Sequence, residues 1–229
     1  MANMIPGVPT KQEMMRYSVN RPGAQEVVRQ SLYDFQTYDA TNGHSTLTFF
    51  QVPAGQSSKT KEDTNMELAG TLPAPKNMLV QSIEIRFYPG VNPSTVNNND
   101  ADFDLAAAEF INDVYTLAKK GFLRLFIGSK DYLLEAPLDR FPAKSYLNVA
   151  AATAAAYTQA SGADGARQAN VQYATLGGRP YNLVPPITLP ATQNFSVSLE
   201  WPGGAQALPS GVDGRIGIIL DGLLFRLSQ

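Results

Sequence analysis

The side chains that could carry chemistry are few, and the first to consider is the single histidine of the chain, His44. A Ser-His-Asp arrangement needs an imidazole that a carboxylate orients beside a nucleophile. Ser45 follows His44, but both residues stand directly after Asn42-Gly43, a dipeptide typical of a hairpin turn. We therefore expect no catalytic triad here, and one histidine is too few for the usual histidine-based zinc site.

Three aspartates, Asp100, Asp102 and Asp104, have the spacing with which a calcium-binding loop begins. Such a loop needs glycine at its sixth position and a bidentate carboxylate at its twelfth, where this chain has Leu105 and Ile111. Aspartates that precede or open a helix also cap its free N–H groups and favour its dipole. Helix capping therefore accounts for the three residues, and we expect no metal site.

Paired carboxylates for glycoside hydrolysis can come from distant strands, and Glu84 and Glu200 are the candidates here. Both alternate with apolar neighbours, which favours a solvent-facing position on a sheet over a catalytic one. The Gly-Gly pair at 177–178 is followed by Arg-Pro and lacks the lysine and hydroxyl residue of a nucleotide-binding loop. The sequence thus predicts no catalytic, cofactor-binding or metal-binding residue, and a protein that is not an enzyme.

Composition points to a protein with extended surfaces. Charged residues make up 17% of the chain, below the roughly 25% that is usual, and its net charge is −2. This balance gives no support to nucleic-acid contact, because such contact depends on attraction to phosphates. There is no cysteine, and we find neither a signal peptide nor an apolar run of membrane-span length. We expect a soluble, non-secreted protein.

The chain divides into an extended N-terminal arm, residues 1–30, and a single domain, residues 31–229. The arm is polar and proline-containing, and it is either disordered or ordered against a neighbouring subunit. In the domain, short apolar runs separated by Gly, Pro and Asn predict about eight strands. The expected strands are 32–38, 45–52, 78–88, 122–127, 131–136, 171–176, 194–201 and 215–227.

Two hairpins are expected, because turn residues separate two pairs of these runs. The first joins 32–38 to 45–52 through the Asn-Gly pair, and the second joins 122–127 to 131–136 through Gly128. Long connections are expected at 53–76, at the alanine-rich insertion 143–170 and at the proline-rich bridge 181–190.

One helix is predicted over residues 101–120, where apolar residues recur at steps of three and four. Lys119 and Lys120 suit its C-terminal end, and Gly121 supplies a left-handed stop. Trp201 is in phase with apolar neighbours and is expected in the core. The residues expected to carry the core are Phe49, Ile83, Ile85, Phe87, Phe110, Leu125, Phe195, Val197, Leu199, Ile216 and Ile218.

This order of elements resembles the single jelly-roll coat proteins of icosahedral viruses, and among them the capsid proteins of tailless bacteriophages. The passages PITLPATQNFSVSLEWP, from residue 186, and RIGIILDGLLFR, from residue 215, are the most suggestive. The resemblance is one of architecture over residues 31–229 and carries over no functional residue. It implies an all-β jelly-roll sandwich of two four-stranded sheets with one inserted helix and long loops.

The resemblance further implies a self-assembling capsid subunit of a virion, made in the host cytoplasm. Its partners would be copies of itself in a symmetric shell, together with other virion proteins, and it would need no cofactor and no small-molecule substrate. A virion accessory protein, such as a cement or spike-base subunit, fits the same sequence. A carbohydrate-binding β-sandwich and a glycosidase-like enzyme on the same fold are the alternatives from other classes.

Overall fold

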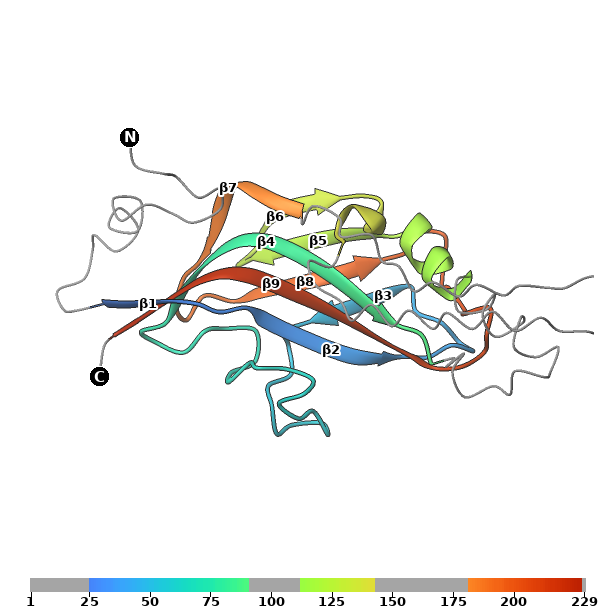
Figure 1. Cartoon of the computed structure of the whole chain (residues 1–229), viewed down its shortest axis with the longest axis horizontal. Helices are drawn as coiled ribbons and strands as arrows, with labels where there is room; N and C mark the ends of the chain where they lie inside the picture. The colour runs from blue at the N-terminus through green and yellow to red at the C-terminus, as the bar shows by residue number, and fades with distance from the viewer. Residues whose placement is uncertain (1–24, 91–111, 143–180, 228–229) are drawn as a thin grey trace, which may run out of the picture.

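The computed structural model describes residues 25–90, 112–142 and 181–227, which form two antiparallel β-sheets that face each other (Figure 1). The first sheet has five strands: β1 (Gln25–Arg29), β2 (Leu32–Tyr38), β4 (Asn77–Tyr88), β7 (Tyr181–Leu189) and β9 (Gly214–Leu227). The second has four: β3 (Thr46–Phe49), β5 (Phe122–Ile127), β6 (Lys130–Glu135) and β8 (Phe195–Glu200). The expected all-β sandwich is confirmed at this level.

The five-stranded sheet is organised around β9, the longest strand of the described ranges. On one side β9 pairs with β1 over residues 223–227 and with β2 over residues 214–220. On its other side it pairs with β4, which in turn pairs with β7. In the four-stranded sheet the order is β3-β8-β5-β6. The nearly continuous apolar run of β9 reflects burial on both of its faces: Ile218 and Leu220 belong to the main core, and Leu223 and Phe225 belong to a second apolar cluster.

The core lies between the two sheets and is built from alternate residues of each strand. All expected core residues that the structure describes belong to it, with Ile85 and Phe87 partly buried and the other eight, from Phe49 to Ile218, buried. Phe110 lies outside the described residues. Trp201 is 1% exposed, which confirms its core position. Burial alternates along β5, and apolar residues alternate with polar ones in the sequence of β8, which explains why the sequence pattern located these residues.

The first expected hairpin is wrong, because β2 and β3 lie in different sheets. Asp39 organises the turn between them: its carboxylate accepts hydrogen bonds from the N–H groups of Thr41 and Asn42. Gly43 has a φ of 64°, and a Cβ there would stand 2.4 Å from the backbone of Gln206. The Asn-Gly pair thus makes a tight turn, but the turn carries the chain from one sheet to the other. The apolar residues of β2 therefore enter the core from the five-stranded sheet, and those of β3 enter it from the four-stranded sheet.

The second expected hairpin is confirmed, since β5 and β6 pair on either side of a turn at Gly128. The pairing shifts between Leu125 and Phe126, so that Tyr132 is an extra residue on β6. As a result, Asp131 and Leu134 pair with outward-facing residues of β5.

The expected bridge at 181–190 is instead the edge strand β7. Its pairing with β4 holds at Tyr181 and Asn182 and again from Ile187 to Leu189, with a register shift between the two parts. Val184, within the shift, is 90% exposed. Prolines interrupt a central strand but are tolerated at an edge or a bulge, and this tolerance is what the sequence interpretation missed.

The last residues of the expected arm, Gln25–Arg29, form β1 and belong to the first sheet. Residues 1–24 of the arm, the insertion 143–170 and the expected strand 171–176 lie outside the described residues, as do the three aspartates and the 177–178 pair. The helix is described over 112–120. A short 3-10 helix, η2 (Leu138–Arg140), follows β6.

Gly121 ends the helix for a reason other than the expected one, since its backbone is not left-handed. A Cβ on Gly121 would stand 2.5 Å from Leu138 Cδ1 and 2.8 Å from Trp201 Nε1. Trp201 Nε1 also donates a hydrogen bond to the Leu117 carbonyl. Glycine is therefore required for the close approach of the helix to the end of the sandwich.

Candidate interaction surfaces

Those residues weighed for chemistry in the sequence that the structure describes are held in structural roles or lie apart from each other. The Asp39 N–H donates to His44 Nε2 at 3.2 Å, and the His44 ring stands edge-on to Tyr38, so the histidine serves the turn between the sheets. The carbonyl of the adjacent Ser45 accepts a hydrogen bond from the Trp201 N–H.

The two glutamates lie on the outer faces of different sheets and do not face each other across a cleft. Glu200 is half-buried on β8, where it accepts a hydrogen bond from Ser198 and lies 3.5 Å from Arg124. Glu84 on β4 is only 3% exposed, with Arg86 3.6 Å away. The expectation of a solvent-facing Glu84 is therefore wrong, because alternation fixes the face of a strand but not what covers that face.

Across the described residues, no group of three or more His, Asp or Glu side chains could hold a metal ion. In the same ranges, no helix has the length and apolar character needed to cross a membrane.

The outer face of the five-stranded sheet is filled by the protein's own side chains. The Phe35 ring lies against Gly217, and the Arg215 guanidinium stacks on it at 4.6 Å. Arg215 also bonds to the Asp63 carboxylate at 2.9 Å. The neighbouring Tyr88 ring, 6.2 Å from Phe35, remains 42% exposed. Tyr33, on the other side of Phe35, is partly buried, so this cluster presents Tyr88 alone as a strongly exposed ring.

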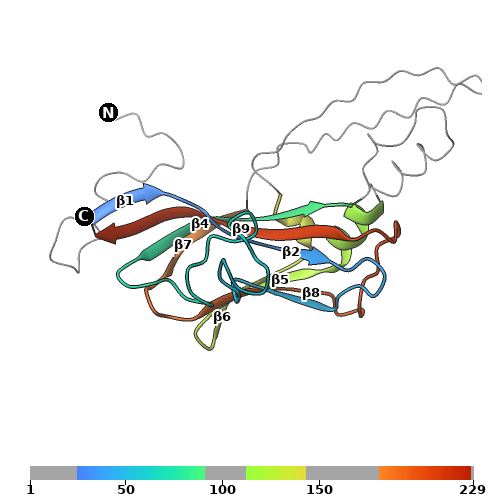
Figure 2. The same cartoon turned by 90° about the horizontal axis from the view of Figure 1, so that it is seen from below.

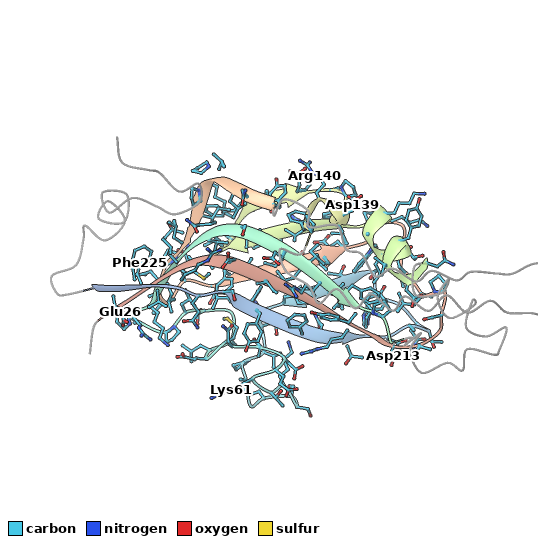
Figure 3. The ribbon with its side chains drawn as sticks, viewed as in Figure 1. Glu26, Lys61, Asp139, Arg140, Asp213 and Phe225 are labelled. Atoms are coloured by element: carbon cyan, nitrogen blue, oxygen red, sulfur yellow. The ribbon has the colours of Figure 1, made fainter. Side chains whose placement is uncertain are left out.

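A loop closes the edge of β2, and we refer to it as the edge loop (residues 50–76). Figure 3 shows Lys61 at its far end, below the sheet. The Phe35 N–H donates to the Asp63 carbonyl at 2.7 Å, and the Asn65 N–H donates to the Tyr33 carbonyl at 3.4 Å. The loop backbone therefore satisfies the edge of β2 as a further strand would.

A buried ion pair holds the edge loop in place. Asp34 is fully buried, and its carboxylate accepts hydrogen bonds from Lys59 Nζ at 2.5 Å and from the Phe50 N–H at 2.6 Å. Burial raises the pKa of Asp34 above its usual value, although both donors act in the opposite direction. The sequence interpretation missed this pair. The signal was present as one carboxylate on the side of a strand that also carries Leu32, Gln36 and Tyr38.

The edge of the other sheet at β6 differs from that of β2. Within the part of the chain that the structure describes, β6 pairs only with β5. It carries two large exposed side chains, Leu134 at 60% and Tyr132 at 46%. Figure 2 shows the β5–β6 hairpin at the lower margin of the molecule. Beside it, Arg124 pairs with Asp131 at 2.9 Å and stacks on the Phe126 ring.

Comparison with protein-family models, with curated proteins and with solved structures finds no match to this chain.

Proposed function

We propose that this protein is a jelly-roll subunit that assembles with copies of itself into a closed icosahedral shell. The observation that carries the proposal is the pairing of the strands. Counted from β2, the first strand pairs with the eighth, the second with the seventh, the third with the sixth and the fourth with the fifth, all antiparallel. This is the pairing of one long hairpin rolled into two facing sheets, which is how a jelly roll is built.

A jelly roll hosts several functions, including capsid proteins, lectins and metal-binding cupins, so the fold must be joined to the features of this chain. One histidine is too few for a histidine-built metal centre. The three exposed tyrosines among the described residues, Tyr88, Tyr115 and Tyr132, come from β4, the helix and β6 and form no shared platform for sugars. These features favour a structural role over sugar binding and over catalysis.

The low content of charged residues also supports assembly. Few charges mean that few must be desolvated when subunits pack against each other. The proposed mechanism is geometric: the sandwich is rigid, and its edges and loops meet those of neighbouring subunits around symmetry axes. The virion and the host cytoplasm are the proposed locations, and no substrate or cofactor takes part.

The size distribution of the purified protein tests this proposal. Light scattering at several protein concentrations and salt strengths, with negative-stain microscopy of the same samples, should give closed particles of defined diameter. A monomer under every condition would overturn the proposal. A glycan array on that monomer would then test the carbohydrate-binding alternative.

A further inference from the structure

The free edge of β6 has features that fit a second copy of the same strand. An uncovered edge is a template for another strand, and proteins normally block it with a loop, with proline or with charge. The edge loop blocks β2, and Pro185 and Pro186 remove two N–H groups from β7. In the described ranges β6 has no such loop and no proline, and its exposed Tyr132 and Leu134 are large side chains. It does carry charge, as Lys130, Asp131 and Glu135, so a partner strand has to match these charges.

The faces of β6 follow from its pairing with β5. Lys130 lies opposite Ile127 and Glu135 lies opposite Leu123, and both partners on β5 are buried in the core. Lys130 and Glu135 therefore project to the same, inner side of the sheet, at its margin. Leu134 lies opposite Arg124 and projects outward with Asp131. Lys130 and Glu135 are five positions apart and would lie on opposite sides of a regular strand, but the extra residue Tyr132 places them on the same side.

We propose that two copies associate by antiparallel pairing of β6 with β6 about a two-fold axis between Tyr132 and Leu133. In this register Lys130 of each copy lies opposite Glu135 of the other, and the two residues belong to the same face. Leu134 lies opposite Asp131 in the same way. The inference rests on the proposed function, because it names one contact through which the shell would grow.

Charge complementarity selects this register. A two-fold contact repeats each pair, so the interface gains two Lys130–Glu135 ion pairs. A shift by one residue in one direction would place Asp131 opposite Glu135 of the other copy, and like charges directly opposite each other are destabilising. A shift in the other direction would place Lys130 opposite Leu134 and so lose both ion pairs. Glu135 already bonds to Arg140 and accepts a hydrogen bond from Tyr181 at 3.0 Å. A carboxylate offers about four acceptor positions, so it has capacity for the lysine of the second copy.

The pairing joins the four-stranded sheets of two copies into one continuous sheet. Tyr132 and Leu134 would then lie at its centre, where their exposed apolar surface is removed from water. Arg140, labelled in Figure 3, lies on the same side of the molecule as β6. Its guanidinium bonds to Glu135 at the end of β6.

Charge reversal and mixing test the contact. The variants are Lys130→Glu and Glu135→Lys in the full chain, each measured alone and as an equal mixture by sedimentation at concentrations that span association. Each variant alone should associate about tenfold more weakly than the wild type, because two attractive pairs become repulsive. The mixture should recover wild-type association, since every pair across the axis is again of opposite charge.

Matched controls reverse the same charges on the edge loop. Lys61→Glu and Glu62→Lys make equal changes in net charge at exposed positions away from β6 and should associate as the wild type does. Recovery on mixing also proves that both β6 variants are folded. Should Glu135→Lys fail to fold after losing Arg140, Leu134→Asp gives a second test. Its side chain is 60% exposed, and the substitution should weaken association as strongly.

The outcomes separate this inference from the proposed function. Wild-type shells that the β6 variants form equally well would overturn the β6 contact and leave the shell proposal intact. A charge-dependent dimer without shells would support the contact and overturn the shell. Variants that weaken association without recovery on mixing would overturn the two-fold register, and a wild-type monomer at every concentration would overturn both proposals.

Discussion

The edges of the sandwich at β2 and at β6 differ in what covers the backbone of the edge strand. At β2 the edge loop supplies hydrogen bonds to the strand and is anchored by Asp34 inside the core. At β6 the described residues supply no strand on the side away from β5, and the side chains of Tyr132 and Leu134 are exposed to solvent. The comparison teaches that the chain itself closes the edge at β2, whereas at β6 the described residues provide no such closure. The closed edge should govern stability, and the open edge should govern association.

The largest expected effect comes from breaking the closed edge at Asp34. Asp34→Ala leaves the Lys59 ammonium and the Phe50 N–H without their buried acceptor, and the loss of one partner from a buried pair costs about 3–5 kcal/mol. The free energy of unfolding in urea measures it. On the open side, Asp131→Ala removes a partly exposed ion pair with Arg124 and should cost less than about 1 kcal/mol. Equal costs at the two positions would remove the contrast between the edges.

The second largest effect on stability is expected from the side-chain packing around Phe35, on the closed edge strand β2. Gly217→Ala would place a Cβ 2.1 Å from the Phe35 ring, which Arg215 holds from another side. Overpacking of this kind costs about 1–3 kcal/mol, measured as a lower midpoint of urea unfolding. Gly203→Ala is the matched control, because nothing lies within 4 Å of its Cβ position. A Gly217→Ala protein as stable as the Gly203→Ala protein would show that Phe35 is not fixed as described.

A smaller effect is the pH dependence of the closed edge, where two aspartates act with opposite signs. Burial raises the pKa of Asp34 in the folded protein, so its contribution to stability falls as pH rises from the ordinary carboxyl range through the raised value. A hydrogen bond from the Thr60 N–H lowers the pKa of Asp63, so its contribution is present above the ordinary value and is lost as pH falls through the lowered one.

Unfolding free energies of the wild type, Asp34→Asn and Asp63→Asn from about pH 3 to about pH 7 separate the two carboxylates. As pH rises, the wild type should lose stability relative to Asp34→Asn and gain it relative to Asp63→Asn. If both stability differences changed with pH in the same direction, the description of Asp34 as a buried carboxylate and of Asp63 as a hydrogen-bonded surface carboxylate would be contradicted.

The smallest change in stability is expected on the open edge. Leu134→Asp alters a side chain that is 60% exposed, so the unfolding free energy should stay within about 0.5 kcal/mol of the wild type. Association should nevertheless fall, because the new aspartate would lie directly opposite Asp131 of the second copy, and like charges there repel each other. A marked loss of stability in the isolated subunit would show that Leu134 serves the fold rather than a contact.

The regular part of the fold could be predicted from the sequence because alternation locates strands. The alternating residues of β5 and β8, such as Leu125 and Val197, were placed in the core by that pattern and are fully buried. Pairing was harder to predict. The Asn-Gly turn indicates a reversal of the chain, but whether its two strands pair depends on β8 and β9, which lie more than a hundred residues away.

The interaction surfaces could be predicted only in part for the same reason. Lys59 reaches Asp34 across 25 residues, and no local pattern shows that a lysine in a charged loop is bound to a buried carboxylate. The edge position of β6 follows from the order of the strands in its sheet. The sequence predicted both strands of the β5–β6 hairpin, but it does not show which of the two lies at the edge.

Electron microscopy of the wild type, Leu134→Asp and Leu68→Asp, prepared at the same concentration, tests the account most directly. Leu68 lies on the edge loop and is 47% exposed, so it matches Leu134 in kind and approximately in exposure. We predict closed particles of one diameter for the wild type and for Leu68→Asp, and none for Leu134→Asp. Wild-type protein that stays monomeric at every concentration would contradict the proposal that this sandwich builds a shell.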